Sequence, residues 1–242
     1  MKAITFIAIT LLAGAIAGTI LGAINQVVVE PYVDHAIELE MRNTAQSGQV
    51  ITNPAEFAAY RFWQKGGEII AGTILGLSIG SLYGIVFAYT RGSISGTNNK
   101  KKALIVASIM WFVLFLMPAL KYPPNPPAVG NPETIYYRQS LYVAFLAISG
   151  FSALGLTFLY RKMASSNTKK AIIPSAYAAI MAGAYLAMPA NPDPINAPID
   201  LVIGFRITSA ITISVFWALL GIIFGTFWDK LNPDETARIS VR

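Results

Sequence analysis

Six long apolar runs, separated by polar or proline-rich connections, dominate the pattern of this chain. Each run has about the 20 residues that an α-helix needs to cross the hydrocarbon core of a bilayer. The pattern therefore predicts the all-α fold class, a polytopic membrane helical bundle that forms a single integral membrane domain over residues 1–242. We place the six transmembrane helices at about residues 3–25, 68–90, 103–120, 141–160, 171–188 and 207–228.

The first run has a second interpretation as a signal peptide. Lys2 precedes the run, and Leu21-Gly22-Ala23 resembles a cleavage site. However, the apolar part is about twice as long as the core of a usual signal peptide, which has roughly 7–15 residues. We therefore expect the first helix to be retained, with cleavage as the alternative.

Glycines recur every four residues in the first two apolar runs, which also share the hexapeptide Ala-Gly-Thr-Ile-Leu-Gly at 17–22 and 71–76. Residues four apart lie on one helix face, and a stripe of glycines lets two backbones approach closely in lipid. The stripes predict that the first two transmembrane helices pack together, and a substrate path along the same groove is the alternative. The glycines are Gly14, Gly18, Gly22, Gly72, Gly76, Gly80 and Gly84.

Parts of the chain repeat. Met117-Pro118-Ala119 is matched by Met188-Pro189-Ala190, and each is followed by a proline-rich loop. The segment from Asn53-Pro54 to Arg61 resembles the segment from Asn131-Pro132 to Arg138, with a looser copy from Pro198 to Arg206. The repeats predict that the six helices form three related helical hairpins, a feature that is common in membrane transport folds.

The proline-rich loops and the repeated arginines predict an outer vestibule. The arginines recur at similar depth, where arginine reaches lipid headgroups, pairs with carboxylates or binds an anion. All three roles stay open at this point. The vestibule residues are Lys121, Tyr122, Pro123, Pro124, Asn125, Pro126, Pro127, Arg61, Arg138 and Arg206.

Composition supports the membrane class and excludes several kinds of site. Of the residues, 55% are hydrophobic and only 12% are charged, a balance typical of membrane proteins. The chain has no cysteine and one histidine, which excludes disulfides, thiolate metal sites, Fe–S clusters and a multi-histidine site within one chain. No phosphate-binding loop and no zinc-protease motif occurs, so we expect no enzyme activity.

Basic residues concentrate at the N-terminus, in the connections 91–102 and 161–170, and after Trp228. Counting Lys, Arg, Asp and Glu, these segments carry +9 and the remaining connections −3, within a total of +6. Loops rich in Lys and Arg stay in the cytoplasm, so we expect a multi-pass protein of the cell membrane with both termini cytoplasmic. The basic excess therefore indicates topology and predicts no nucleic-acid partner.

The connection after the first run, residues 26–67, is acidic and contains an expected amphipathic helix at about residues 31–46. At helical spacing its acidic residues form one stripe beside the single histidine, and oxygen ligands with an imidazole suit a divalent cation. A solvated helix face is the alternative, as is a structural pair between Arg61 and Glu68. The candidate metal residues are Glu30, Asp34, His35, Glu38 and, deeper, Glu68.

The segment Lys121-Tyr122-Pro123-Pro124-Asn125-Pro126-Pro127-Ala128-Val129-Gly130, followed by Asn131-Pro132-Glu133 and Arg138, resembles the CbtA family of predicted cobalt transporter subunits. The glycine-rich first helix running into Glu30-Pro31 supports the resemblance. It implies a multi-pass component of cobalt uptake with a small, histidine-rich single-span partner, CbtB. It also implies transported Co²⁺ and no firmly bound cofactor.

Together these features lead to the hypothesis of a membrane subunit for divalent metal ion transport, with cobalt as the implied ion. The alternative is a non-transporting membrane scaffold that binds a partner complex through its outer loops. An anion carrier that uses the three arginines ranks third. Membrane lipid surrounds the protein in each case, and oligomer formation stays open.

Overall fold

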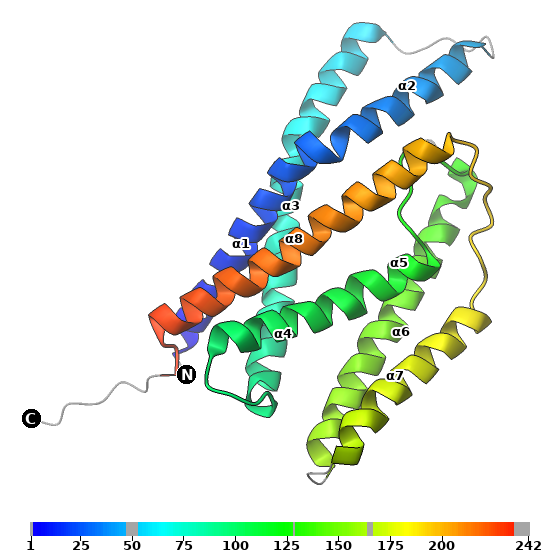
Figure 1. The fold of residues 1–242 in the computed structure, drawn as a ribbon. Coiled ribbons are helices and arrows are strands. Elements are labelled where there is room, and N and C mark those ends of the chain that lie inside the picture. Colours follow the sequence, from blue (N-terminus) through cyan, green and yellow to red (C-terminus); the bar gives the residue numbers. More distant parts are fainter. Residues whose placement is uncertain (1, 47–52, 128, 164–166, 235–242) are drawn as a thin grey trace, which may run out of the picture. The chain divides into compact units, whose positions relative to one another are not determined.

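A computed structural model describes residues 2–46, 53–127, 129–163 and 167–234, and in these ranges the chain is helical and has no β-strand (Figure 1). The all-α prediction is therefore confirmed. The elements, which include two 3₁₀ turns (η1 and η3) and one π-helical turn (η2), are α1 (Ala3–Val28), α2 (Glu30–Gln46), α3 (Pro54–Thr90), η1 (Arg91–Ser93), α4 (Asn99–Trp111), η2 (Phe112–Leu116), α5 (Met117–Lys121), η3 (Pro132–Thr134), α6 (Ile135–Lys162), α7 (Asn167–Ala187) and α8 (Ile199–Leu231).

Within the described ranges, six helical segments are long and apolar enough to cross a bilayer, as the hydrophobic pattern predicted. The chain is therefore a multi-pass membrane protein. The segments are Ala3–Val28, Ala55–Ser93, Asn99–Lys121, Pro132–Lys162, Lys170–Ala187 and Ile199–Leu231.

The second span, α3, is longer than a bilayer crossing requires. Its 37 residues extend over about 55 Å at roughly 1.5 Å per residue, whereas the hydrocarbon core is about 30 Å thick. The helix begins at Pro54, where the Asn53 side chain accepts a hydrogen bond from the Ala55 N–H and so acts as the N-cap. One end of α3 can therefore lie outside the core with its charged residues, Arg61 and Lys65, in polar surroundings.

The chain divides into two compact units, Met1–Ser108 with Ile207–Arg242, and Ile109–Arg206. Both boundaries fall inside helices, so α4 and α8 each contribute to both units. The expectation of a single membrane domain stays a prediction.

In the first unit, α1 and α3 pack along the two glycine stripes, and all seven glycines meet the opposite helix. A Cβ on Gly14 would lie 2.3 Å from the carbonyl oxygen of Gly76, and a Cβ on Gly18 would lie 2.2 Å from that of Gly72. Non-bonded atoms do not approach this closely. The absence of side chains is therefore what lets the two backbones touch.

The rest of the first unit has an aromatic core. Tyr83 and Phe87 of α3 meet Phe224 of α8 edge-on, with ring centroids 4.9 and 5.0 Å apart, and Phe87 also meets Trp228 at 5.0 Å. The buried Tyr83 hydroxyl donates a hydrogen bond to the carbonyl of Ala103 at 2.6 Å. This bond satisfies the polar end of the ring, so the aromatic cluster holds α8 to α3 without an unpaired hydroxyl.

In the second unit, a π-helical turn precedes Pro118. The Met117 N–H bonds to the carbonyl of Phe112, five residues earlier. In that register the carbonyl of Val113 would need Pro118 as its donor, but proline has no N–H. The fully buried Ser149 hydroxyl of α6 donates to this carbonyl instead, at 2.6 Å, and so joins α6 to the irregular turn.

The three related helical hairpins are not shown by the structure. α1 packs against α3, but α6 contacts both the η2–α5 segment and α7, and α8 packs against α3 in the first unit. Repeated sequence motifs determine local features such as helix starts and loops. The choice of packing partner depends instead on side chains that are far apart in the sequence.

Candidate functional site

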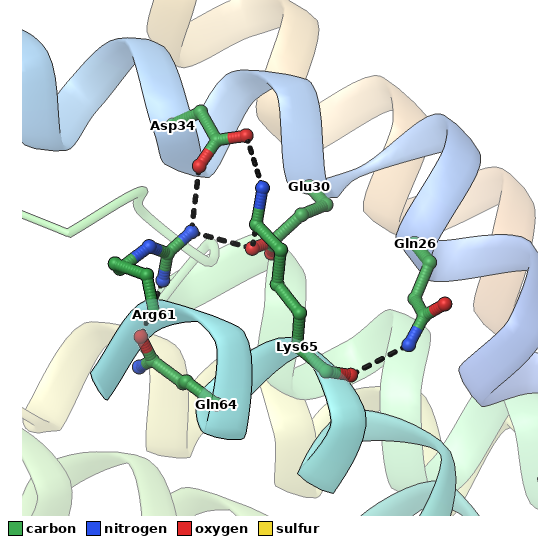
Figure 2. A network of polar contacts seen from close by, with 6 residues as sticks. All are labelled: Gln26, Glu30, Asp34, Arg61, Gln64 and Lys65. Carbon is green, nitrogen blue, oxygen red and sulfur yellow. Dashed lines mark hydrogen bonds and ion pairs between the residues drawn. The ribbon is translucent and has the colours of Figure 1, made fainter. Parts of the chain in front are cut away.

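The α2–α3 cluster, which we define as Glu30, Asp34, Arg61 and Lys65, joins the start of α2 to α3 (Figure 2). Glu30 and Asp34 lie four residues apart on α2, and Arg61 and Lys65 lie four residues apart on α3. Residues at this spacing share one helix face. Two carboxylates therefore meet two cations along the contact between the helices.

Arg61 is the centre of the α2–α3 cluster. Its guanidinium donates hydrogen bonds to Glu30 Oε1 at 2.5 Å, to Asp34 Oδ1 at 2.7 Å and to the amide oxygen of Gln64. The side chains of Arg61 and Glu30 are only 10% and 11% exposed. A buried pair of this kind depends on both partners, because loss of one leaves an uncompensated charge in a poorly solvated place.

Lys65 and Asp34 form the accessible side of the cluster. Lys65 Nζ donates to Asp34 Oδ2 at 2.7 Å, and the two side chains are 41% and 48% exposed. Burial alone would raise the pKa of Asp34, but the hydrogen bonds and charges of Lys65 and Arg61 outweigh it and hold this pKa below its ordinary value. Asp34 is therefore an ionised, partly solvated carboxylate at neutral pH.

His35 and Glu38 lie on α2 outside the α2–α3 cluster. Both are exposed, and Glu38 Oε1 accepts a hydrogen bond from Arg42 at 2.6 Å, one turn further along the helix. An exposed pair at this spacing contributes only about 0.3–0.5 kcal/mol. Glu38 is therefore held weakly.

Two buried acceptor atoms lie where the last turns of α1 pack against α3. Glu68 Oε2 and Asn25 Oδ1 are buried, and neither has a hydrogen-bond partner in the described part of the chain. Next to Asn25, the Gln26 amide donates to the carbonyl of Lys65 at 2.5 Å. A Cβ on Gly22 would lie 2.9 Å from the carbonyl of Glu68, which places this residue against α1.

The ion pair between Arg61 and Glu68, which the sequence left open as an alternative, does not form. In the described ranges, the carboxylate partners of Arg61 are Glu30 and Asp34. The two acids take this position because the start of α2 lies beside α3 at Arg61 and Lys65 (Figure 2). Seven-residue spacing on one helix could not reveal this competition.

The residues expected to meet a metal ion are not gathered into one coordination group. Within residues 2–46, 53–127, 129–163 and 167–234, no three His, Cys, Asp or Glu side chains are arranged so that they could hold a metal ion. Glu30 and Asp34 do come together, but they hold Arg61 and Lys65. A role for these carboxylates and for Glu68 in ion capture stays a prediction.

The proline-rich loop after α5 is tied to other parts of the second unit. The Tyr122 hydroxyl donates to the carbonyl of Pro189 at 2.6 Å, which joins the two proline-rich loops. Arg206 donates to Asn125 Oδ1 at 2.7 Å, and Lys121 Nζ donates to a backbone carbonyl of α7 at 2.8 Å. These contacts hold the loop in place, and its role as a vestibule stays a prediction.

Arg138 belongs to a separate cluster around Asp193. Arg138 Nε lies 3.0 Å from Asp193 Oδ2, which also accepts hydrogen bonds from the Asn131 N–H and the Thr134 hydroxyl. Gly130 has a φ of 95°, and a Cβ there would lie 2.7 Å from Asp193 Oδ2, so this position requires glycine. Each of the three repeated arginines therefore has partners within its own unit.

The sequence analysis gave no role to Lys65 or Asp193, although Lys65 forms an ion pair with Asp34 and Asp193 forms one with Arg138. Lys65 follows Arg61 by four residues, so helical spacing alone is a signal that could have included it. Asp193 has no such signal. It reaches Arg138 of α6 only because the loop after α7 folds against the loop before α6, where Asp193 also accepts a hydrogen bond from the Asn131 N–H.

A family model described as "Probable cobalt transporter subunit (CbtA)" matches residues 3–229 of the chain. The match extends from the first candidate membrane helix into the last. No curated protein and no solved structure matches. The description names a transport subunit and no catalytic activity.

Proposed function

Since the chain belongs to the CbtA family of probable cobalt transporter subunits, we propose that it is a membrane subunit of a divalent metal ion transport system, with cobalt as the leading substrate. The family match over residues 3–229 carries the proposal, and the six membrane-length helices support it. The basic connections favour cytoplasmic termini, which assigns α2 and the proline-rich loops to the outer side.

The acidic face of α2 is the proposed place of first encounter with the ion. Glu30, Asp34 and Glu38 recur every four residues with His35 beside them, and carboxylate and imidazole groups are suitable ligands for first-row divalent metals. The ionised and half-exposed state of Asp34 supports this role. An arriving ion competes with Lys65, so capture is an exchange of one cation for another.

Glu68 is the proposed next carboxylate on the path inward. Its Oε2 atom is buried and has no hydrogen-bond donor among the residues that the structure describes, and an ionisable group at the edge of a membrane span is a candidate functional group. The sequence has no nucleotide-binding loop, so energy for transport would come from an ion gradient or from a partner. A CbtB-like single-span subunit is the proposed partner.

Radiolabelled cobalt uptake into proteoliposomes, with and without the small partner, tests the proposal. Asp34→Asn and Glu68→Gln should each lower saturable uptake, because each removes a negative charge from the proposed path. Glu40→Gln is the matched control, since Glu40 is an exposed α2 carboxylate outside the α2–α3 cluster. Unchanged uptake in both variants would show that Asp34 and Glu68 do not lie on the ion path. No uptake by the wild-type protein, with or without the small partner, would contradict transport.

A membrane scaffold that binds a partner complex is the second candidate. The observation that favours it is that the gathered acids of the α2–α3 cluster are engaged by Arg61 and Lys65. A stable partner recovered after gentle solubilisation, together with no ion flux from the complex, would support this function over transport.

A further inference from the structure

The second unit contains a cavity of about 760 Å³ between three helical segments. Its walls are formed by the end of α4 with η2 and α5, by α6, and by α7. All these segments belong to candidate membrane spans. The volume falls within the roughly 300–1,000 Å³ of pockets that hold small organic ligands.

The wall of the cavity is apolar, and the hydroxyls of Tyr177 and Thr157 are already engaged. Tyr177 Oη lies 2.7 Å from Ser149 Oγ, and since Ser149 donates to the carbonyl of Val113, the tyrosine is the donor to the serine. The Thr157 hydroxyl donates to the carbonyl of Ala153 at 2.8 Å. None of the described lining residues is charged, so the cavity suits hydrocarbon and not an ion.

The cavity is elongated along α7. Its α7 wall extends from Ile173 to Leu186, which is about 20 Å at roughly 1.5 Å per residue. Only 6% of the α7 membrane window is buried, which leaves this wall open to the acyl chains of the bilayer.

Basic side chains continue the cavity walls at one end. Arg161 lies one turn beyond Thr157 on α6, and Lys170 lies one turn before Pro174 on α7. Residues at this spacing share a face with the lining residues. Arg161 and Lys170 are exposed, as is the neighbouring Lys162. Basic groups at the membrane end of a pocket between helices attract anionic headgroups.

We propose that the cavity of the second unit binds an anionic phospholipid from the leaflet next to the α6–α7 connection. One acyl chain occupies the apolar cavity, and the phosphate lies near Arg161 and Lys170. The apolar wall explains the binding of the chain, and the basic end explains the selection of the headgroup. This site is independent of the proposed ion path.

Lipid retention measured by native mass spectrometry tests the headgroup part of the proposal. The purified protein is given equal amounts of dioleoyl phosphatidylglycerol and dioleoyl phosphatidylcholine, and the retained lipids are counted. We expect preferential retention of phosphatidylglycerol. Since one basic residue near an anionic headgroup contributes about a fivefold preference, Arg161→Gln and Lys170→Gln should each reduce the preference by roughly that factor. Equal retention of the two lipids by the wild-type protein would overturn the proposal.

Two alanine variants of α7 test the acyl-chain part. Ala182 lines the cavity and Ala179 does not, and both are exposed. Ala182→Phe should lose bound lipid of either headgroup because the ring fills the cavity, whereas Ala179→Phe should retain it. Ala178→Leu provides a second cavity variant if Ala182→Phe does not elute as a monodisperse species. Retention of lipid by both cavity variants, or a protein partner in its place, would refute the site.

Discussion

Arg61 and Lys65 carry the same charge, but their side chains differ in burial. Arg61 is buried with Glu30, and Lys65 is half-exposed beside Asp34. Desolvation makes a buried charge dependent on its partner, while water replaces most of what an exposed charge loses. The two cations therefore contribute unequally to stability although they meet the same pair of acids.

Replacing Arg61 should destabilise the fold much more than replacing Lys65. Arg61→Gln leaves the buried Glu30 with only Lys65 Nζ, 3.9 Å from its Oε1, as a counter-charge, and loss of the closer buried partner should cost up to about 3–5 kcal/mol. Lys65→Gln removes a solvated pair and should cost no more than about 1 kcal/mol. Denaturant titration of both variants in the same detergent measures the difference. Equal losses would show that the burial of the Arg61 pair has no energetic role.

The stability that Asp34 provides should depend on pH. Its pKa in the folded protein lies below the ordinary value of 3.8, so the ionised group stabilises the fold above that value. The contribution is lost as the pH falls through the lower, folded-state pKa. The melting-temperature difference between wild type and Asp34→Asn should therefore be constant from about pH 7 to pH 5 and shrink below about pH 4. A difference that grows in acid would contradict this pairing.

At the scale of helices, the α1–α3 contact and the π-helical turn are two places where backbone atoms of one helix contact a neighbouring helix. The glycine stripes remove side chains so that two helices touch. The π-helical turn leaves the carbonyl of Val113 without a helical donor, and Ser149 of α6 supplies one. In lipid each unpaired backbone group costs several kcal/mol, so both features restrict which helices can be neighbours.

Adding a methyl group to the glycine contact should separate α1 from α3. A Cβ on Gly18 meets backbone atoms that cannot move aside, and such overpacking costs about 1–3 kcal/mol or more. Gly155 of α6 has no atom of the described residues within 4 Å of its Cβ position, so Gly155→Ala should be neutral or stabilising by up to about 1 kcal/mol. Thermal unfolding of the two variants compares them. A neutral Gly18→Ala variant would mean that the helices are not in backbone contact.

For the molecule as a whole, the orientation of the six spans decides which residues meet substrate. The chain has no cysteine, so single cysteines can report the side of the membrane without further changes. Asn43 of α2 and Ser95, in the connection before α4, are both exposed. They belong to an acidic and a basic connection, respectively.

Labelling with a membrane-impermeant maleimide should distinguish these two connections. In intact cells, Asn43→Cys should react and Ser95→Cys should react only after lysis, because the basic connections stay in the cytoplasm. Labelling of Ser95→Cys alone in intact cells would invert the orientation and move the α2–α3 cluster to the cytoplasmic side.

The sequence by itself determined the six membrane-length helices, because hydrophobic length is a property of each segment and needs no tertiary partner. It also indicated the glycine stripes, which depend on residues only one turn apart. Only the tertiary structure decided that Arg61 pairs with Glu30 and Asp34, that Arg138 meets Asp193, and that α7 leaves an apolar cavity. These features join segments far apart in the chain, and local spacing carries no information about which distant side chain arrives.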